Sequence, residues 1–148
     1  MTRFFDSSAL VKLYSNEVDS EAVRALTGPI VVSVLARVEV PSAIWRKQRL
    51  GDITSEEAGT LALEFEFDWF GDDDAPPRFD AVPADARVLD SAANLVASHG
   101  LRAYDAIHLS TALAVRRILP ECASIVVFDT SLRSAAISEG FELVPSGR

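Results

Sequence analysis

Two aspartates in this sequence directly follow short apolar runs that have the composition of buried strands. Phe4-Phe5 precedes Asp6, and Val127-Phe128 precedes Asp129. In open α/β sheets, ligands bind beyond the carboxyl ends of the strands. The two carboxylates could therefore meet in one crevice if their strands are neighbours. Asp105 stands at the expected start of a helix and can point into the same crevice.

Each acidic residue also has a simpler interpretation. An aspartate between a strand and a helix is commonly an N-cap, and Asp129-Thr130-Ser131 fits that role well. Glu39, taken alone, has the character of a solvated helix residue. The coincidence of several such positions, rather than any one of them, favours a shared acidic site.

A cluster of carboxylates favours a hard divalent cation. Two carboxylates about 4 Å apart repel by roughly 4 kcal/mol at an effective dielectric of about 20, and a divalent ion removes that repulsion. One cysteine and two histidines cannot supply a structural zinc site, so oxygen ligands would have to hold any metal. Such ligands favour Mg²⁺ or Mn²⁺, which polarise a phosphodiester and lower the pKa of a bound water.

Short β-rich runs alternate with longer segments of helical periodicity, a pattern that predicts an α/β fold with a parallel sheet of four or five strands. The expected strands are Arg3-Phe4-Phe5, Ile30-Val31-Val32, Ile125 to Phe128 and Phe141 to Val144, with a short fifth near Phe79 to Val82. The expected helices are Ser8 to Tyr14, Ser20 to Leu26, Val34 to Leu50, Ser55 to Phe70, Ala84 to Ser98, Tyr104 to Leu119 and Ser131 to Glu139. Ser55 is expected to cap the fourth helix.

Composition indicates a single domain over residues 1–148, because 49% of the residues are hydrophobic. The first residues do not form the apolar core of a signal peptide, and no apolar stretch has the length of a membrane span, so we expect a cytoplasmic protein. The net charge of −8 argues against nucleic-acid binding through a broad basic surface. Phosphate could still be approached through a metal ion.

Four segments, taken together, resemble the motifs of PIN domains. Phe5 to Tyr14 resembles the first motif, in which an apolar strand leads to an aspartate, small polar residues and an apolar helix. Leu101 to Leu109 is similar to the central motif, in which an aspartate opens a helix. Val127 to Leu132 resembles the C-terminal strand and acidic residue, and Ser33 to Arg46 matches the helix with the second acidic residue. These segments span nearly the whole chain, and the length resembles the VapC toxin subgroup.

The resemblance implies a three-layer α/β/α fold and a metal-dependent endoribonuclease, the toxin of a type II toxin–antitoxin system. Asp6, Glu39, Asp105 and Asp129 would be the catalytic residues, with RNA as the substrate. Asp6 and Asp105 are the candidates for direct ligation of Mg²⁺ or Mn²⁺, and the other two would act through water or at a second ion. A VapB-like antitoxin with a basic tail segment would hold the toxin inactive.

Two residues near these positions qualify the assignment. Pro41 falls two residues after Glu39 inside an expected helix, where proline costs roughly 3 kcal/mol. A kink is therefore expected, and it could re-aim Glu39. His108 follows Asp105 by three residues and shares its helix face, which suggests a general base. A partly buried structural histidine is the more common occurrence, and we adopt that interpretation.

The chain has two dense basic runs, Arg46-Lys47-Gln48-Arg49 and Arg116-Arg117. Either could steer RNA towards the acidic site, although a solvated helix end is the more common meaning of such a run. The helices from Val34 to Phe70 carry more large apolar side chains than one face needs, which predicts a homodimer.

Two other function classes remain open at this stage. One is aspartate-based phosphoryl transfer, although Asp6-Ser7-Ser8 lacks a second aspartate two positions on. The other is a catalytically idle binding module that keeps the fold only to pair with a partner.

Overall fold

The fold is known from a computed structural model that describes residues 1–146. Five parallel strands form one sheet in the order β3-β2-β1-β4-β5. They are β1 (Arg3–Phe5), β2 (Ile30–Ser33), β3 (Phe79–Val82), β4 (Ser124–Val126) and β5 (Glu142–Val144). The expected α/β class and the parallel sheet are confirmed.

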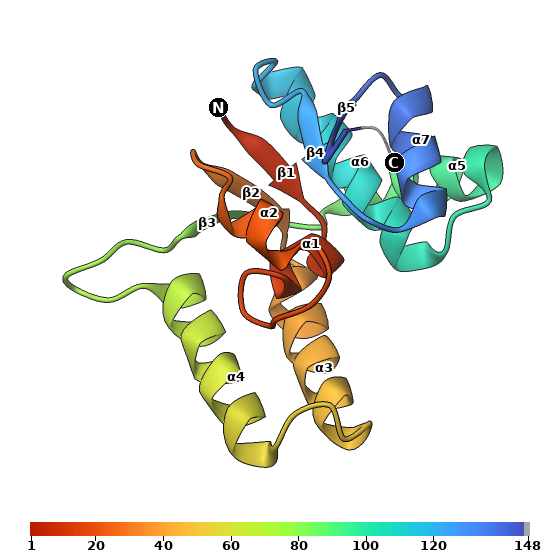
Figure 1. Cartoon of the computed structure of the whole chain (residues 1–148). Coiled ribbons are helices and arrows are strands. Elements are labelled where there is room, and N and C mark those ends of the chain that lie inside the picture. The colour runs from red at the N-terminus through yellow and green to blue at the C-terminus, as the bar shows by residue number, and fades with distance from the viewer. Residues whose placement is uncertain (147–148) are drawn as a thin grey trace.

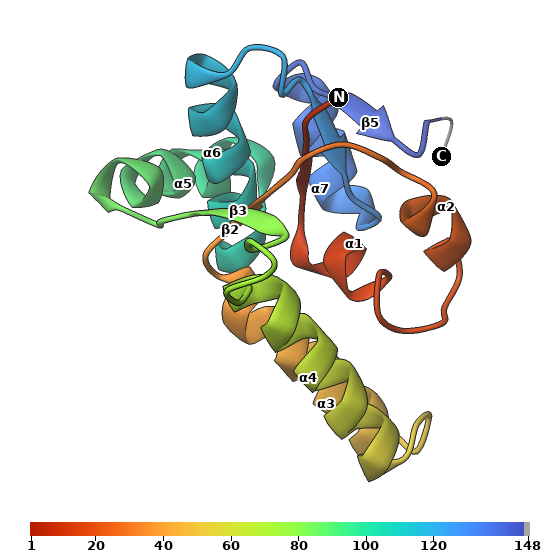
Figure 2. The same ribbon diagram turned by 90° about the vertical axis from the view of Figure 1, so that its left-hand side faces the viewer.

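Helices flank the sheet on both faces (Figure 1). They are α1 (Ser7–Val11), α2 (Ser20–Arg24), α3 (Ala36–Arg49), α4 (Ser55–Phe70), α5 (Ala86–His99), α6 (Ala103–Ile118) and α7 (Thr130–Ser138). α3 and α4 lie side by side as a hairpin that projects away from the sheet (Figure 2). α5, α6 and α7 gather on the opposite side of the sheet from α1 (Figure 1).

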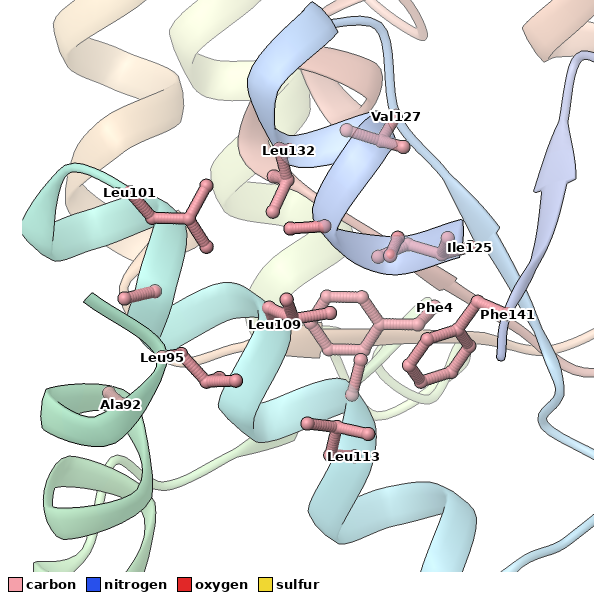
Figure 3. Close-up of a cluster of buried hydrophobic side chains, with 14 of the residues drawn as sticks. Phe4, Ala92, Leu95, Leu101, Leu109, Leu113, Ile125, Val127, Leu132 and Phe141 are labelled. Atoms are coloured by element: carbon pink, nitrogen blue, oxygen red, sulfur yellow. The ribbon is translucent and has the colours of Figure 1, made fainter. Parts of the chain in front are cut away.

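The layers follow from the two-residue period of the strands, which sends successive side chains to opposite faces. Phe4 and Ile125 are buried against α5, α6 and α7, in a cluster that includes Leu109 (Figure 3). Phe5 and Val126 are buried in a second cluster, under α1, α3 and α4. The strands are apolar on both faces because helices cover both.

The ends of several elements differ from the expected ones. α4 is capped by Thr54 rather than Ser55: the Thr54 hydroxyl accepts a hydrogen bond from the Glu57 N–H, and the Glu57 carboxylate accepts one from the Thr54 N–H. β4 ends at Val126, two residues earlier than expected. α3 continues through Pro41, which lies inside it. No helix among residues 1–146 is long and apolar enough to cross a membrane.

The direction in which the chain adds strands reverses at β1. The chain first adds β2 and β3 on one side of β1, and later adds β4 and β5 on the other. β1 and β4 are therefore neighbours, with Phe5 opposite Val126, and the N–H of Asp6 donates to the carbonyl oxygen of Val126 at 3.3 Å. Ligand sites of open α/β sheets lie at such a switch point. The condition for Asp6 and Asp129 to share a crevice was that the strands before them are neighbours, and this pairing of β1 with β4 is confirmed.

Candidate active site

Asp6 is held at the end of β1 by two hydrogen-bond donors. Its Oδ1 accepts from the N–H of Ala9 at 2.9 Å, which caps α1, and the Ser8 hydroxyl lies 2.9 Å from both carboxylate oxygens. The residue is only 4% exposed. Burial raises the pKa of Asp6 to about 6, against the lowering effect of these hydrogen bonds, and the charge of Asp105 adds a small further increase.

Asp105 and Asp129 occupy different positions relative to their helices. Asp129 caps α7 by accepting from the Leu132 N–H at 2.9 Å. Asp105 is not a cap, because α6 begins at Ala103 and Asp105 lies in its first turn. Burial, and then the negative charge of Asp129, raise the pKa of Asp105. At the carboxyl edge of the sheet, Asp129 therefore raises the pKa of Asp105, and Asp105 raises the pKa of Asp6.

A cation already lies between two of these carboxylates. The guanidinium of Arg102 has its Nε 3.5 Å from Oδ2 of Asp105 and an Nη 3.7 Å from Oδ1 of Asp129. The Arg102 side chain is 82% exposed, so it can move away at little cost. Sequence reasoning gave Arg102 no role. Its position three residues before Asp105 was the available signal, since residues three apart face each other on a helix.

Glu39 lies in the first turn of α3 and is tied to two residues from other elements. Its Oε1 accepts from the Ser7 hydroxyl at 2.9 Å and lies 2.5 Å from Nε2 of His108. Burial alone would raise the pKa of Glu39, but the hydrogen bonds and charge supplied by His108, with Ser7, outweigh it and lower that pKa. Pro41 therefore does not prevent Glu39 from reaching the site.

His108 is a positioning residue in this arrangement. The ring is 2% exposed, and Nε2 also lies 3.2 Å from the Ser7 hydroxyl. Nδ1 has no hydrogen-bond partner among residues 1–146. Nε2 donates to Glu39 in this geometry, because an ionised carboxylate can only accept a hydrogen bond. The interpretation of His108 as a buried structural histidine fits, and a proton-accepting role at Nε2 does not.

Replacing His108 with Leu should lower stability by about 1–3 kcal/mol, because it leaves Glu39 partly buried without its main donor. His108→Gln, which keeps a donor near the Nε2 position, should retain most of the stability. The pKa of Glu39 is lowered in the folded protein, so this contribution is present at neutral pH and is lost as the pH falls through that pKa. Urea unfolding at pH 7 and near pH 3, well below the ordinary Glu pKa of 4.5, checks this: equal losses at both pH values would contradict the pairing.

The oxygen donors suit a hard divalent ion that keeps part of its water shell. No group of three or more histidine, cysteine or acidic side chains within residues 1–146 is arranged to hold an ion directly. Mg²⁺ commonly takes one or two carboxylates and completes its octahedron with water and substrate oxygen. The Arg102 guanidinium beside Asp105 and Asp129 marks the place as one that accepts positive charge.

The sequence matches one protein family over most of its length. The profile of the PIN domain matches residues 3–138. The sequence is 33% identical over 144 residues to Ribonuclease VapC46 of Mycobacterium tuberculosis, covering 95% of each chain. It is 32% identical over 146 residues to Ribonuclease VapC45 of the same species, covering 97% of this chain and 94% of the relative. A solved toxin–antitoxin complex from Klebsiella pneumoniae shares the fold, with a TM-score of 0.58 at 16% identity over 86% of this chain and 87% of that chain.

Proposed function

Because this chain belongs to the PIN-domain family, we propose that it is a metal-dependent endoribonuclease and the toxin of a type II toxin–antitoxin system. Relatives that align over nearly their whole length are named ribonucleases. The observation that carries the proposal is the position of Asp6, Asp105 and Asp129 at the switch point of the sheet. At this point the charge of Asp105 raises the pKa of Asp6, and the charge of Asp129 raises the pKa of Asp105.

Asp6 and Asp105 are the proposed direct ligands, and Asp129 and Glu39 act through water or at a second ion. The Mg²⁺ or Mn²⁺ ion would supply electrophilic polarisation of the phosphodiester and a water of lowered pKa. The chain supplies position: Ser8 and the Ala9 N–H orient Asp6. A water would attack the phosphorus in line with the leaving oxygen: the P–O bond to that oxygen breaks as the new P–O bond forms, the water gives up a proton, and the leaving oxygen takes up a proton from solvent.

His108 and Ser7 have a different task in this proposal. They hold the Glu39 carboxylate in one orientation and keep it ionised, because their hydrogen bonds lower its pKa. An ionised, fixed Glu39 can accept a proton from water or bind an ion through water. Neither Ser7 nor His108 needs to touch the substrate.

The proposal is tested by incubating the purified protein with a single-stranded RNA and with a DNA of the same sequence. We expect internal cleavage of the RNA with Mg²⁺ or Mn²⁺, loss of cleavage on chelation and recovery when the metal is restored. Undiminished cleavage after exhaustive chelation would exclude the metal. Intact RNA under every metal condition would exclude a nuclease and leave a binding module.

A VapB-like antitoxin is the proposed protein partner. The Arg102 guanidinium beside Asp105 and Asp129 indicates the chemistry of an inhibitor, since an inserted Arg or Lys would neutralise the same carboxylates. We expect a small protein with a DNA-binding half and a basic tail segment to co-purify from the native host. Isolation of the native protein without such a partner would count against this assignment.

Self-association is expected because the α3–α4 hairpin leaves several large apolar side chains in solvent. Trp45, Leu63, Phe67 and Phe70 are 37%, 67%, 53% and 63% exposed. By contrast Phe65 is fully buried, so the hairpin has more apolar surface than its own packing uses. Light scattering should give twice the 16.0 kDa mass of the chain. A 16.0 kDa species at every concentration would refute the homodimer.

A further inference from the structure

The two basic runs of the chain lie in different parts of the fold. Arg116 and Arg117 are in the last turn of α6, which leads into the start of β4, and this is the edge away from Asp6 (Figure 1). Arg116 is also committed to the fold: it donates to the carbonyl oxygen of Glu139 at 2.7 Å, and its guanidinium lies 4.1 Å from the Phe141 ring centroid. Arg116 and Arg117 therefore lie too far from the acidic site to guide a substrate to it.

The other run lies on the helix that carries Glu39. α3 begins just after the carboxyl end of β2 and leads away from the sheet (Figure 2). Glu39, Ala43 and Arg46 are spaced four and three residues apart, so they share one face of α3. Seven residues at 1.5 Å each place Arg46 roughly 10 Å along the helix from Glu39.

A groove of about 270 Å³ lies along this face. Ser8 and Val11 of α1 form one wall, and Ala43 and Arg46 of α3, with Leu50 directly after the helix, form another. Ser8 is also the residue whose hydroxyl contacts Asp6, so the groove adjoins the acidic site at Ser8. A strand lying across Asp6 therefore has an adjacent groove that leads to Arg46.

The lining of the groove carries two acidic side chains, Glu17 and Asp52, and two basic ones, Arg46 and Lys47. Glu17 lines it, but Lys12 and Lys47 contact the Glu17 carboxylate at 3.0 and 2.6 Å and neutralise it. Asp52 is the other acidic residue of the lining. Arg46 is exposed, and the part of the chain that the structure describes gives its guanidinium no ion pair. Of the two cations that line the groove, Lys47 is paired with Glu17, so Arg46 is the one available to bind an anionic ligand.

We propose that this groove binds a backbone phosphate of single-stranded RNA next to the scissile linkage, with Arg46 as the contacting cation. The inference rests on the proposed nuclease function and adds the path of the substrate. A guanidinium holds phosphate oxygens with two parallel hydrogen bonds, which fixes the strand as well as attracting it. Phosphate contacts of this kind position a strand without reading its sequence.

The test compares Arg46→Gln with Arg117→Gln, a matched loss of one exposed helix-end arginine at the far edge of the sheet. Steady-state cleavage of an RNA oligonucleotide is measured at several salt concentrations with Mg²⁺. Arg46→Gln should raise KM roughly tenfold with kcat nearly unchanged, the effect of losing a charge-assisted contact. It should also reduce the slope of log KM against log salt by about 0.7, the value for one phosphate on a single strand. Arg46→Lys should recover most of the salt slope, and Arg117→Gln should match the wild type.

Substrates with one uncharged methylphosphonate linkage, moved along the strand, locate the contact. In the wild type one linkage beside the cleavage site should raise KM when neutralised, and in Arg46→Gln that linkage should no longer matter. If both variants cleave RNA with equal KM and equal salt slopes, the groove does not bind the substrate. The proposed nuclease function would be unaffected by that result. A wild-type protein that cleaves no RNA would overturn the proposed function, and this inference with it.

Discussion

Metal-free Asp6→Asn protein should unfold at a higher temperature than metal-free wild type at pH 7. Burial raises the pKa of Asp6 to about 6 from its ordinary 3.8, so the ionised carboxylate destabilises the folded state at neutral pH. A rise of that size corresponds to about 3 kcal/mol. Asparagine keeps an oxygen for the Ala9 N–H and carries no charge. The expected gain in Tm is roughly 5–10 °C.

The sign of the pH dependence follows from proton uptake. Between about pH 4 and pH 6 the folded state holds more protons at Asp6 than the unfolded state does, so this group makes stability fall as pH rises through that window. The difference in Tm between Asp6→Asn and wild type should therefore shrink as the pH is lowered from 7 to 4. Mg²⁺ or Mn²⁺ should raise the Tm of the wild type and barely affect the variant.

Asp85 supplies the matched control. It caps α5 by accepting from the Val88 N–H at 3.0 Å, as Asp6 caps α1, but it is exposed. Asp85→Asn should change Tm little, because asparagine caps about as well as aspartate. If the Tm of Asp6→Asn at pH 7 is no higher than that of the wild type, the buried charge of Asp6 does not destabilise the folded protein. The site would then have no excess negative charge for a cation to neutralise.

Asp105→Asn should reduce RNA cleavage by about 10²-fold or more, the scale of losing one preorganised electrostatic group in an active site. Asp105 is not a helix cap, so the substitution should leave α6 intact. It also removes the repulsion from Asp129 that raises the pKa of Asp105, so the metal-free variant should be at least as stable as the wild type. Initial rates at saturating Mg²⁺ and thermal melts of the same samples check both expectations.

Asp90→Asn, on the exposed face of α5, is the control for Asp105→Asn and should cleave RNA at the wild-type rate. If Asp105→Asn cleaves RNA at the wild-type rate and its Tm responds to metal as the wild type does, Asp105 has a structural role only. The nuclease assignment would then lose its central residue.

The parallel sheet could be predicted, and so could the position of two acidic residues after strand ends, because both depend on local patterns. Apolar runs such as Phe4-Phe5 mark strands buried on both faces, and parallel strands bring their carboxyl ends to one edge. The placement of Asp6 and Asp129 after neighbouring strands needed only the further fact that β1 and β4 pair.

The contacts of Glu39 could not be predicted in the same way. Its partner His108 is 69 residues away, and the pairing exists because α3, α1 and α6 converge at one edge of the sheet. The sequence predicts a kink at Pro41 that could re-aim Glu39; in the structure α3 continues through Pro41, and Glu39 contacts His108 and Ser7. Arg102 was missed because an exposed arginine before a helix has no distinctive pattern until the position of Asp129 is known.

The most direct measurement is to titrate chelator-treated protein with Mn²⁺ and follow ion binding by calorimetry and RNA cleavage in parallel. If Asp6, Glu39, Asp105 and Asp129 form a metal-dependent nuclease site, cleavage should be absent without the ion and should rise with its occupancy at the same midpoint. Asp105→Asn should lose both signals together. Cleavage that persists without bound ion, or Mn²⁺ binding that is unchanged in Asp105→Asn, would contradict the account.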